Sequence, residues 1–374
     1  MNGPSAISRG ELGRRLIDWV GLTAVRPGSV AETVHRLSAV QIDPMQVVAP
    51  AHLWTLSLRR GPTPLSLLDR ELGRGRLLEA YCHARCLVHR DDAQAMVAGW
   101  RRRRAARHIV RYGVEDAARQ VMATAETGVS FTSRELDAQS RVSGFWDAET
   151  ERRTKATSVA VDLLWAEGRL AVVGRRGGQK LYRLMEGHLP DVARQIDTLG
   201  DDEAQSAAIL HSLRAYGVVM GGGVAVGWGA LGSRSRAWIQ QAVECGWLAP
   251  LRLTDGPAEL CWALPALMER PLPRASRYAL LAPVDNLLWG RGRLEAVFHF
   301  RYRWEAYTPA SARRGGSYNM PVLARAGFYG EADAQWRNGR LHITWRPAEG
   351  AQDPGPAVVK AGRRAEALCL TLRT

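Results

Sequence analysis

Residues 169–183 constrain the fold most, because they have the sequence of a short β-hairpin with a basic tip. Two strand-like runs flank Gly177-Gly178, and a Gly-rich turn between such runs is typical of a hairpin. Two helical segments precede it, a short one capped by Ser133 and a longer one over residues 155–167. Helix, helix and hairpin in this order predict a winged helix-turn-helix unit.

The same order returns further along the chain. Residues 204–216 and 235–246 have helical patterns, and residues 247–253 and 260–264 have strand-like patterns on either side of a turn. This predicts a second copy of the unit. Gly221-Gly222-Gly223 lacks the flanking strand and helix of a nucleotide-binding glycine motif, so we interpret it as a linker.

The N-terminal part is predicted to be helical and shows no clear hairpin. One helix is expected over residues 8–20. A second is capped by Ser29 with Glu32 three residues later and ends at Gln41, and a third covers residues 52–60. A long basic helix is expected over residues 91–121.

The last hundred residues have a different pattern, with strand-like stretches at 297–302, 341–345 and 367–372. The predicted fold class is therefore mainly helical with small β-hairpins, built from tandem winged-helix units with a C-terminal α+β region. The predicted domains are 1–125, 126–200 and 201–272 as winged-helix units and 273–374 as the α+β region.

The charge balance indicates a polyanionic partner. Lys and Arg number 51 against 37 acidic residues, which gives a net charge of +14. Biased coding explains the choice of Arg over Lys, but it does not explain the excess of bases, which favours nucleic acid. No stretch approaches the roughly 20 apolar residues of a membrane span, and no secretion signal is present, so we expect a cytoplasmic protein.

Gln41-Ile42-Asp43-Pro44 carries the candidate chemistry. In extended backbone, residues two apart point the same way, so Gln41 and Asp43 are expected to face one pocket. An amide that positions a water beside a carboxylate that activates it forms a minimal hydrolytic device. The plain structural alternative is a helix-end amide and a turn-forming Asp before proline.

Basic side chains near helix ends and at the hairpin tip are candidate phosphate contacts, although a solvated helix face explains the Arg101–Arg104 run equally well. His52 is a candidate to orient Asp43 or contact phosphate, with a structural role as the alternative. The predicted DNA-binding set is His52, Arg59, Arg60, Arg101, Arg102, Arg103, Arg104, Arg175, Arg176, Lys180, Arg313 and Arg314.

The odd number of cysteines, five, suits a reducing compartment. Cys82, His83 and Cys86 lie close together, but no second ligand pair of matching spacing follows. A buried-thiol interpretation is therefore favoured over a metalloprotein, and no metal or cofactor is expected.

Longer motifs resemble a known family. Residues 37–44 with 47–52, residues 281–289 and residues 298–310 resemble the bacterial winged-helix DNA glycosylases of the YcaQ/AlkZ type, and Glu79 with His83 is a weaker match. The resemblance implies three tandem winged-helix units that form a C-shaped basic channel. It also implies that Gln41 and Asp43 form the catalytic motif, of the Gln-apolar-Asp kind.

The resemblance further implies excision of N7-alkylated purines and unhooking of interstrand crosslinks by a monomer acting on double-stranded DNA. Scarcity of lysine argues against Schiff-base lyase chemistry, so a monofunctional enzyme is expected. The sequence departs from the family at Pro50, Ala84 and Glu331, which suggests a specialised paralogue, for example one that gives self-resistance to a DNA-damaging toxin.

The alternative function is a non-catalytic winged-helix regulator. Such a protein normally reads paired half-sites as a dimer, and no heptad pattern for a dimer helix is visible. Symmetric operator binding would favour it, and base release by a monomer would exclude it.

Overall fold

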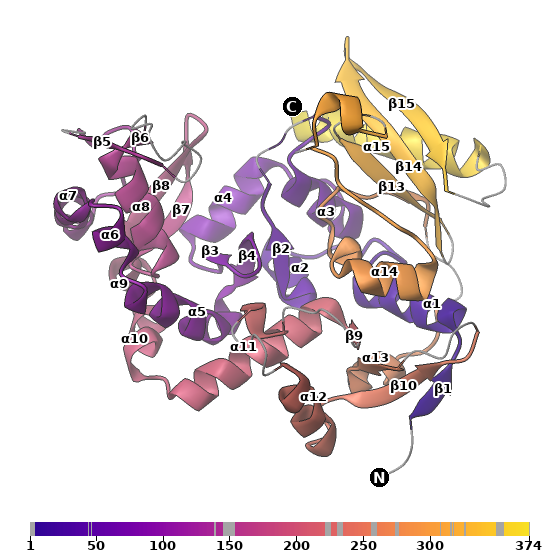
Figure 1. The fold of residues 1–374 in the computed structure, drawn as a ribbon. Helices are drawn as coiled ribbons and strands as arrows, with labels where there is room; N and C mark the ends of the chain where they lie inside the picture. The colour runs from indigo at the N-terminus through magenta and orange to yellow at the C-terminus, as the bar shows by residue number, and fades with distance from the viewer. Residues whose placement is uncertain are drawn as a thin grey trace. The chain divides into compact units, whose positions relative to one another are not determined.

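The computed structural model describes residues 4–373 except 44, 46, 138–139, 145–153, 221–225, 230–234, 256–259, 274–276, 307, 315, 317, 325–326 and 349–354. Helices and small sheets make up the fold, as expected (Figure 1). Contacts within the chain divide it into two compact units, residues 1–65 with 212–374 and residues 66–211. Among the described helices, none is long and apolar enough to cross a membrane. The winged-helix boundaries drawn from the sequence remain a prediction.

The N-terminal part of the first unit contains α1 (Arg9–Trp19), α2 (Val30–Leu37), β2 (Ala39–Gln41) and α3 (Ala51–Arg60). Ser29 and Glu32 form the predicted capping box, with N–H···O distances of 2.8 and 3.0 Å. The expected helix end at Gln41 is wrong. Ser38 adopts a φ of 63°, which stops α2 at Leu37 and lets the chain continue as a strand.

A four-stranded sheet in this unit has the order β1-β10-β11-β9. The predicted hairpin is confirmed as β10 and β11, and β1 joins β10 in parallel. The helices and strands of this part are β1 (Ser5–Ile7), β9 (Val218–Met220), β10 (Ala249–Leu253), β11 (Leu260–Ala263), α12 (Ser235–Glu244) and α13 (Pro265–Glu269). Helix α11 (Asp201–Tyr216) begins in the second unit, and its last residues, from Ser212, belong to this one. Gly221–Gly223, predicted to form a linker, lie outside the described residues.

The predicted C-terminal α+β region is confirmed. An antiparallel sheet of order β12-β13-β14-β15 packs against α15, which lies across one face of it (Figure 1). Small residues, Ala332 and Ala334 on β14 and Ala361 and Ala365 on α15, belong to the shared core. The elements are β12 (Ala279–Leu280), β13 (Asn319–Ala324), β14 (Gly327–Arg337), β15 (Arg340–Pro347), α14 (Arg291–Phe298) and α15 (Gly355–Arg373).

Two of the three strands expected in this region are wrong. Residues 297–302 begin in the last turn of α14 and continue without strand structure, and residues 367–372 lie in α15. Short apolar runs fit a strand and a buried helix face equally well, so periodicity could not separate them. The stretch 341–345 does lie in β15.

The second unit contains the expected basic-tipped hairpin. In β7 and β8, Arg176 pairs with Gln179 across a two-residue turn whose glycines, Gly177 and Gly178, have φ of 56° and 76°. Positive φ at both turn positions is the geometry that glycine permits. A second hairpin of β3 and β4 was not foreseen from the sequence.

Two helix expectations in this unit are wrong. The long helix over residues 91–121 is broken after α5 by Arg107 (φ 52°) and again by Gly113 (φ 63°), and residues near Ser133 form turns. The helices and strands are α4 (Leu65–Gly73), β3 (Leu77–Tyr81), β4 (Arg85–His89), α5 (Gln94–Ala105), α6 (His108–Arg111), α7 (Glu115–Glu126), β5 (Arg141–Val142), β6 (Thr154–Lys155), α8 (Ala156–Ala166), β7 (Leu170–Arg176), β8 (Gln179–Leu184), α9 (Met185–His188) and α10 (Pro190–Thr198).

Candidate active site and DNA-contacting residues

Gln41 and Asp43 lie where β2 ends. Gln41 is the last residue of the strand and is half-buried, as is Ile42, whereas Asp43 is only 6% exposed. The Asp43 carboxylate accepts a hydrogen bond of 2.8 Å from the backbone N–H of Met45. This bond from the residue two positions on is a common Asp turn, and it fixes one carboxylate oxygen.

Burial raises the pKa of the Asp43 carboxyl above its usual 3.8, while the Met45 N–H acts in the opposite direction. A carboxylate whose pKa is closer to neutral is a stronger base toward water. Tyr318 is buried near it: burial raises the pKa of this phenol first, and the charge of Asp43 raises it further. Tyr318 therefore stays protonated beside the carboxylate.

The chain after Asp43 is anchored on the C-terminal sheet. Val48, Ala49, Ala51 and Trp54 belong to the same buried core as β12, β13, β14 and α15. The Trp54 indole N–H donates to the Leu280 carbonyl over 2.8 Å. The core thus fixes the start of α3 and the loop that carries Asp43.

Asp285 and Asn286, within the motif of residues 281–289, form buried contacts that stabilise the segments next to the site. Asp285 forms a buried bidentate ion pair with Arg59, with both N···O distances 2.8 Å. Asn286 donates to the Ala39 carbonyl over 2.7 Å. Because Ala39 begins β2, this bond holds the strand whose last residue is Gln41. The motif therefore has a structural role in this chain.

His52 is buried in α3, 6% exposed, and its predicted role in orienting Asp43 or binding phosphate remains a prediction. His83, in the second unit, has its pKa lowered to about 4 by burial, so its ring is neutral at pH 7. Burial raises the pKa of the Cys82 thiol, and its sulfur lies 3.7 Å from Met96 Sδ. Within the described residues, no group of three or more His, Cys, Asp or Glu side chains could hold a metal ion.

Arg59 is a correction to the predicted DNA-binding set. Its side chain is 1% exposed, and it donates to the Val20 and Thr55 carbonyls as well as to Asp285. A guanidinium used in this way cannot reach a phosphate. Its neighbour Arg60 is directed back onto the loops around it and donates to the Gly28 and Pro62 carbonyls.

The four arginines of α5 differ in what they contact. Arg101 donates to the Ile196 and Leu199 carbonyls and pairs with Asp201. Arg104 binds Asp197 and the Glu167 carbonyl. Arg103 lies over the Tyr81 ring, 4.5 Å from its centroid. Arg102 is exposed and makes no ion pair within the described ranges, which leaves it the best placed of the four to contact DNA.

At the hairpin of β7 and β8, the basic residues are partly neutralised. Arg175 pairs with Asp69 at 2.8 Å and with Glu79 at 2.7 Å, and its side chain is only 11% exposed. Lys180 lies 3.6 Å from the same Glu79. Arg176 is exposed and pairs with the exposed Glu135. Arg176 is therefore the hairpin residue most available to phosphate.

The last two predicted contacts follow the 3-10 turn of residues 310–312. Arg313 is half-buried and donates to the Thr308 carbonyl over 2.7 Å. Arg314 is exposed, and its backbone N–H donates to Glu305 over 2.9 Å. Arg314 thus extends from an anchored backbone, whereas the guanidinium of Arg313 is already engaged.

Comparison with known proteins now defines the class. The helix–helix–hairpin arrangement fits a winged-helix protein that acts on nucleic acid. The candidate amide–carboxylate pair lies in the N-terminal part of the chain. Residues 34–368 match the family model described as DNA glycosylase AlkZ-like, and the chain belongs to this family. The Streptomyces sahachiroi DNA glycosylase AlkZ is similar in fold, with a TM-score of 0.65, 17% identity and 98% of each chain covered. The family supports a DNA glycosylase with DNA as its substrate.

Proposed function

We propose that the chain is a monofunctional DNA glycosylase for cationic N7-alkylated purines, including interstrand crosslinks and bulky adducts. The observation that carries this proposal is the buried Asp43 carboxylate two residues after Gln41, at the end of a strand in a chain of this family. An N7-alkylated purine already carries positive charge, so the base can leave without a general acid. What the reaction lacks is a nucleophile at the sugar.

Gln41 and Asp43 supply that nucleophile in the proposed mechanism. The Gln41 amide orients a water, and Asp43 takes its proton while its charge stabilises the developing oxocarbenium ion. The bond from Met45 leaves the carboxylate oriented before substrate binds. The products are the free base and an abasic site, with no cofactor required.

Among the predicted contacts, we propose that Arg102, Arg176 and Arg314 bind DNA backbone phosphates, because they are the exposed ones. Lyase chemistry would need a nucleophilic amine. The lysines are Lys155, Lys180 and Lys360. Lys180 lies beside Glu79 and Lys360 over the Tyr278 ring, positions that suit structural roles.

The test is a gel assay on a 5′-labelled duplex with one N7-methylguanine. Strand scission only after alkali treatment supports a monofunctional glycosylase, and scission without alkali would contradict it. A duplex with a nitrogen-mustard crosslink, run in parallel, shows whether the enzyme also separates the two strands. Absence of products from both duplexes, despite tight DNA binding, would favour a non-catalytic DNA-binding protein.

The proposed base predicts a pH dependence. Because burial raises the pKa of Asp43, the carboxylate becomes protonated at a pH above 3.8 as acidity increases. Single-turnover excision should therefore rise with pH through this raised pKa. In Asp43→Asn the residual excision rate should no longer rise with pH in this range. Substrate without enzyme at each pH corrects for spontaneous depurination.

A further inference from the structure

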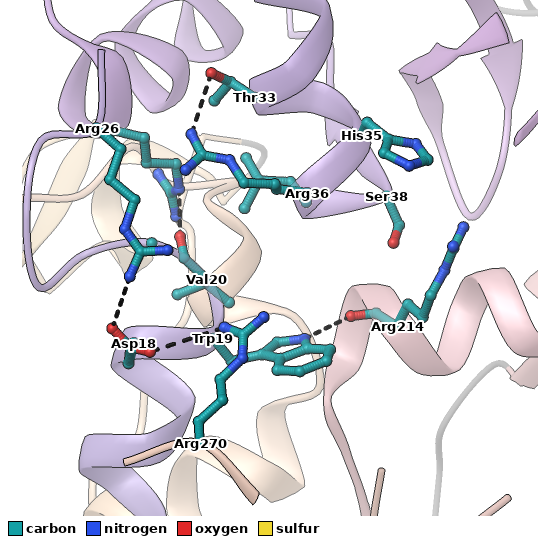
Figure 2. A pocket seen from close by; sticks show the side chains of 13 residues that line it. Asp18, Trp19, Val20, Arg26, Thr33, His35, Arg36, Ser38, Arg214 and Arg270 are labelled. Atoms are coloured by element: carbon teal, nitrogen blue, oxygen red, sulfur yellow. Dashed lines mark hydrogen bonds and ion pairs between the residues drawn. The ribbon is translucent and has the colours of Figure 1, made fainter. Parts of the chain in front are cut away.

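A pocket outside the proposed catalytic pair has five arginines among its thirteen lining residues. It has a volume of about 210 Å³ and lies wholly within the first unit, between the ends of α1 and α2, the end of α11 and the segment at residue 270. We call it the arginine pocket, and its exposed or half-buried basic residues are Arg26, Arg36, Arg214 and Arg270. Figure 2 shows Arg26, Arg36 and Arg270 on one side and Arg214, reaching up beside Ser38, on the other.

The positive charge of this pocket is not balanced by its own carboxylate. Asp18 is the acidic residue among those that line it. Its two oxygens are shared by Arg26, at 3.4 Å, and Arg270, at 3.8 Å, while Thr23 donates to it over 2.6 Å. One carboxylate therefore faces several guanidinium groups. The charge of Arg59, which also lines the pocket, is already offset by Asp285.

Arg36 is an exposed arginine of this pocket. In the part of the chain that the structure describes it makes no ion pair, and its guanidinium donates to the Thr33 hydroxyl over 3.4 Å. Burial lowers its pKa and the charge of Arg26 lowers it further, while the charge of Glu32 acts in the opposite direction. Such like-charge crowding is relieved when an anion binds, which is a property of phosphate sites.

The pocket is also preorganised. The Arg270 guanidinium lies 4.4 Å from the centre of the Trp19 ring, a cation–π arrangement that holds it in place. The Trp19 indole N–H donates to the Arg214 carbonyl over 2.7 Å, which ties α1 to α11 within the unit. The volume exceeds by far the roughly 10–15 Å³ that one water needs, so a phosphate group fits together with hydration water.

We propose that the arginine pocket binds a backbone phosphate of the damaged DNA strand, close to the lesion; this inference rests on the proposed function. Ser38 lines the pocket at the end of α2 and is followed directly by the three residues of β2, the last of which is Gln41. At about 3.3 Å per residue this is roughly 10 Å, close to the rise of three nucleotides at about 3.4 Å each. The exposed side chains of Arg26 and Arg270, 47% and 43%, suit a polymer lying across the opening.

The test measures DNA affinity against salt concentration. In the double variant Arg36→Gln/Arg270→Gln, the slope of log K against log salt should become shallower by about 1, since each neutralised phosphate contributes roughly 0.9. A duplex with one neutral methylphosphonate within about three nucleotides of the lesion should reproduce the loss with wild-type protein and add nothing to the variant. The control is Arg119→Gln, an exposed arginine paired with Asp116 on α7, and its slope should match wild type.

An unchanged slope in the double variant, with its circular dichroism spectrum intact, would overturn the proposal. Titration with inorganic phosphate tests whether the ligand of the pocket is a free anion and not a DNA phosphate. If wild type binds phosphate and the variant does not, yet the DNA slope is unchanged, the pocket is a free-anion site and the DNA assignment is wrong. Base release at saturating DNA is measured separately, so a failure of the pocket is distinguishable from a failure of the glycosylase proposal.

Discussion

Asp43→Asn should lower the single-turnover rate of N7-methylguanine excision by about 100-fold or more, the scale of losing a positioned general base. The amide keeps the shape of the side chain, but it can neither accept a proton nor stabilise positive charge at the sugar. Gln41→Ala should cause a smaller loss of rate, because a water can still reach Asp43 without the Gln41 amide to orient it. Chemical-quench kinetics on a labelled duplex, with enzyme in excess over DNA, measure both effects.

DNA affinity provides the control for these two variants. Neither side chain is proposed to contact phosphate, so both should bind the damaged duplex as wild type does. Asp116→Asn, an exposed acid on α7, is the matched change elsewhere and should leave the rate unaltered. Full activity in Asp43→Asn would remove Asp43 from the mechanism, whatever the fate of Gln41→Ala.

Arg59→Ala should lower the free energy of unfolding of the first unit by about 3–5 kcal/mol, the cost of leaving one partner of a buried ion pair uncompensated. Both side chains of the Arg59–Asp285 pair are almost fully buried, at 1% and 0% exposure. The variant also loses hydrogen bonds to the Val20 and Thr55 carbonyls. Urea unfolding followed by tryptophan fluorescence measures the change.

A double variant separates the charge from the packing. Arg59→Met with Asp285→Leu removes both charges and keeps apolar volume, so it should regain part of the stability lost in Arg59→Ala. Arg119→Ala, which breaks an exposed pair, should not shift the unfolding midpoint. If Arg59→Ala unfolds like wild type, the buried pair does not stabilise the first unit.

Local signals in the sequence predicted much of the fold. The Ser29 and Glu32 capping box and the Gly177-Gly178 turn depend on residues close in the chain, and both were found where expected. The end of α2 was missed because the positive φ of Ser38 has no local signature such as glycine. The strand expected at 367–372 is part of α15, whose apolar face is decided by its packing on the sheet.

For the candidate site too, features that depend on residues close in the chain were predictable, and contacts between distant residues were not. The spacing of Gln41 and Asp43 was visible in the sequence, as was the motif that contains Asp285 and Asn286. The partners of Asp285 and Asn286, Arg59 and Ala39, lie more than 200 positions away, and no periodicity encodes such pairs. Tyr318 near Asp43 was missed for this reason. Arg59 was misassigned because an arginine near a helix end looks alike in sequence whether it meets solvent or a buried acid.

The most direct test of the central claim is detection of the released base. Wild-type protein is incubated with duplex DNA containing N7-methylguanine, and the soluble fraction is analysed by mass spectrometry. We expect free N7-methylguanine in amounts that match the abasic sites in the DNA. DNA that is bound tightly but yields no free base above the enzyme-free control would contradict glycosylase activity on this class of lesion.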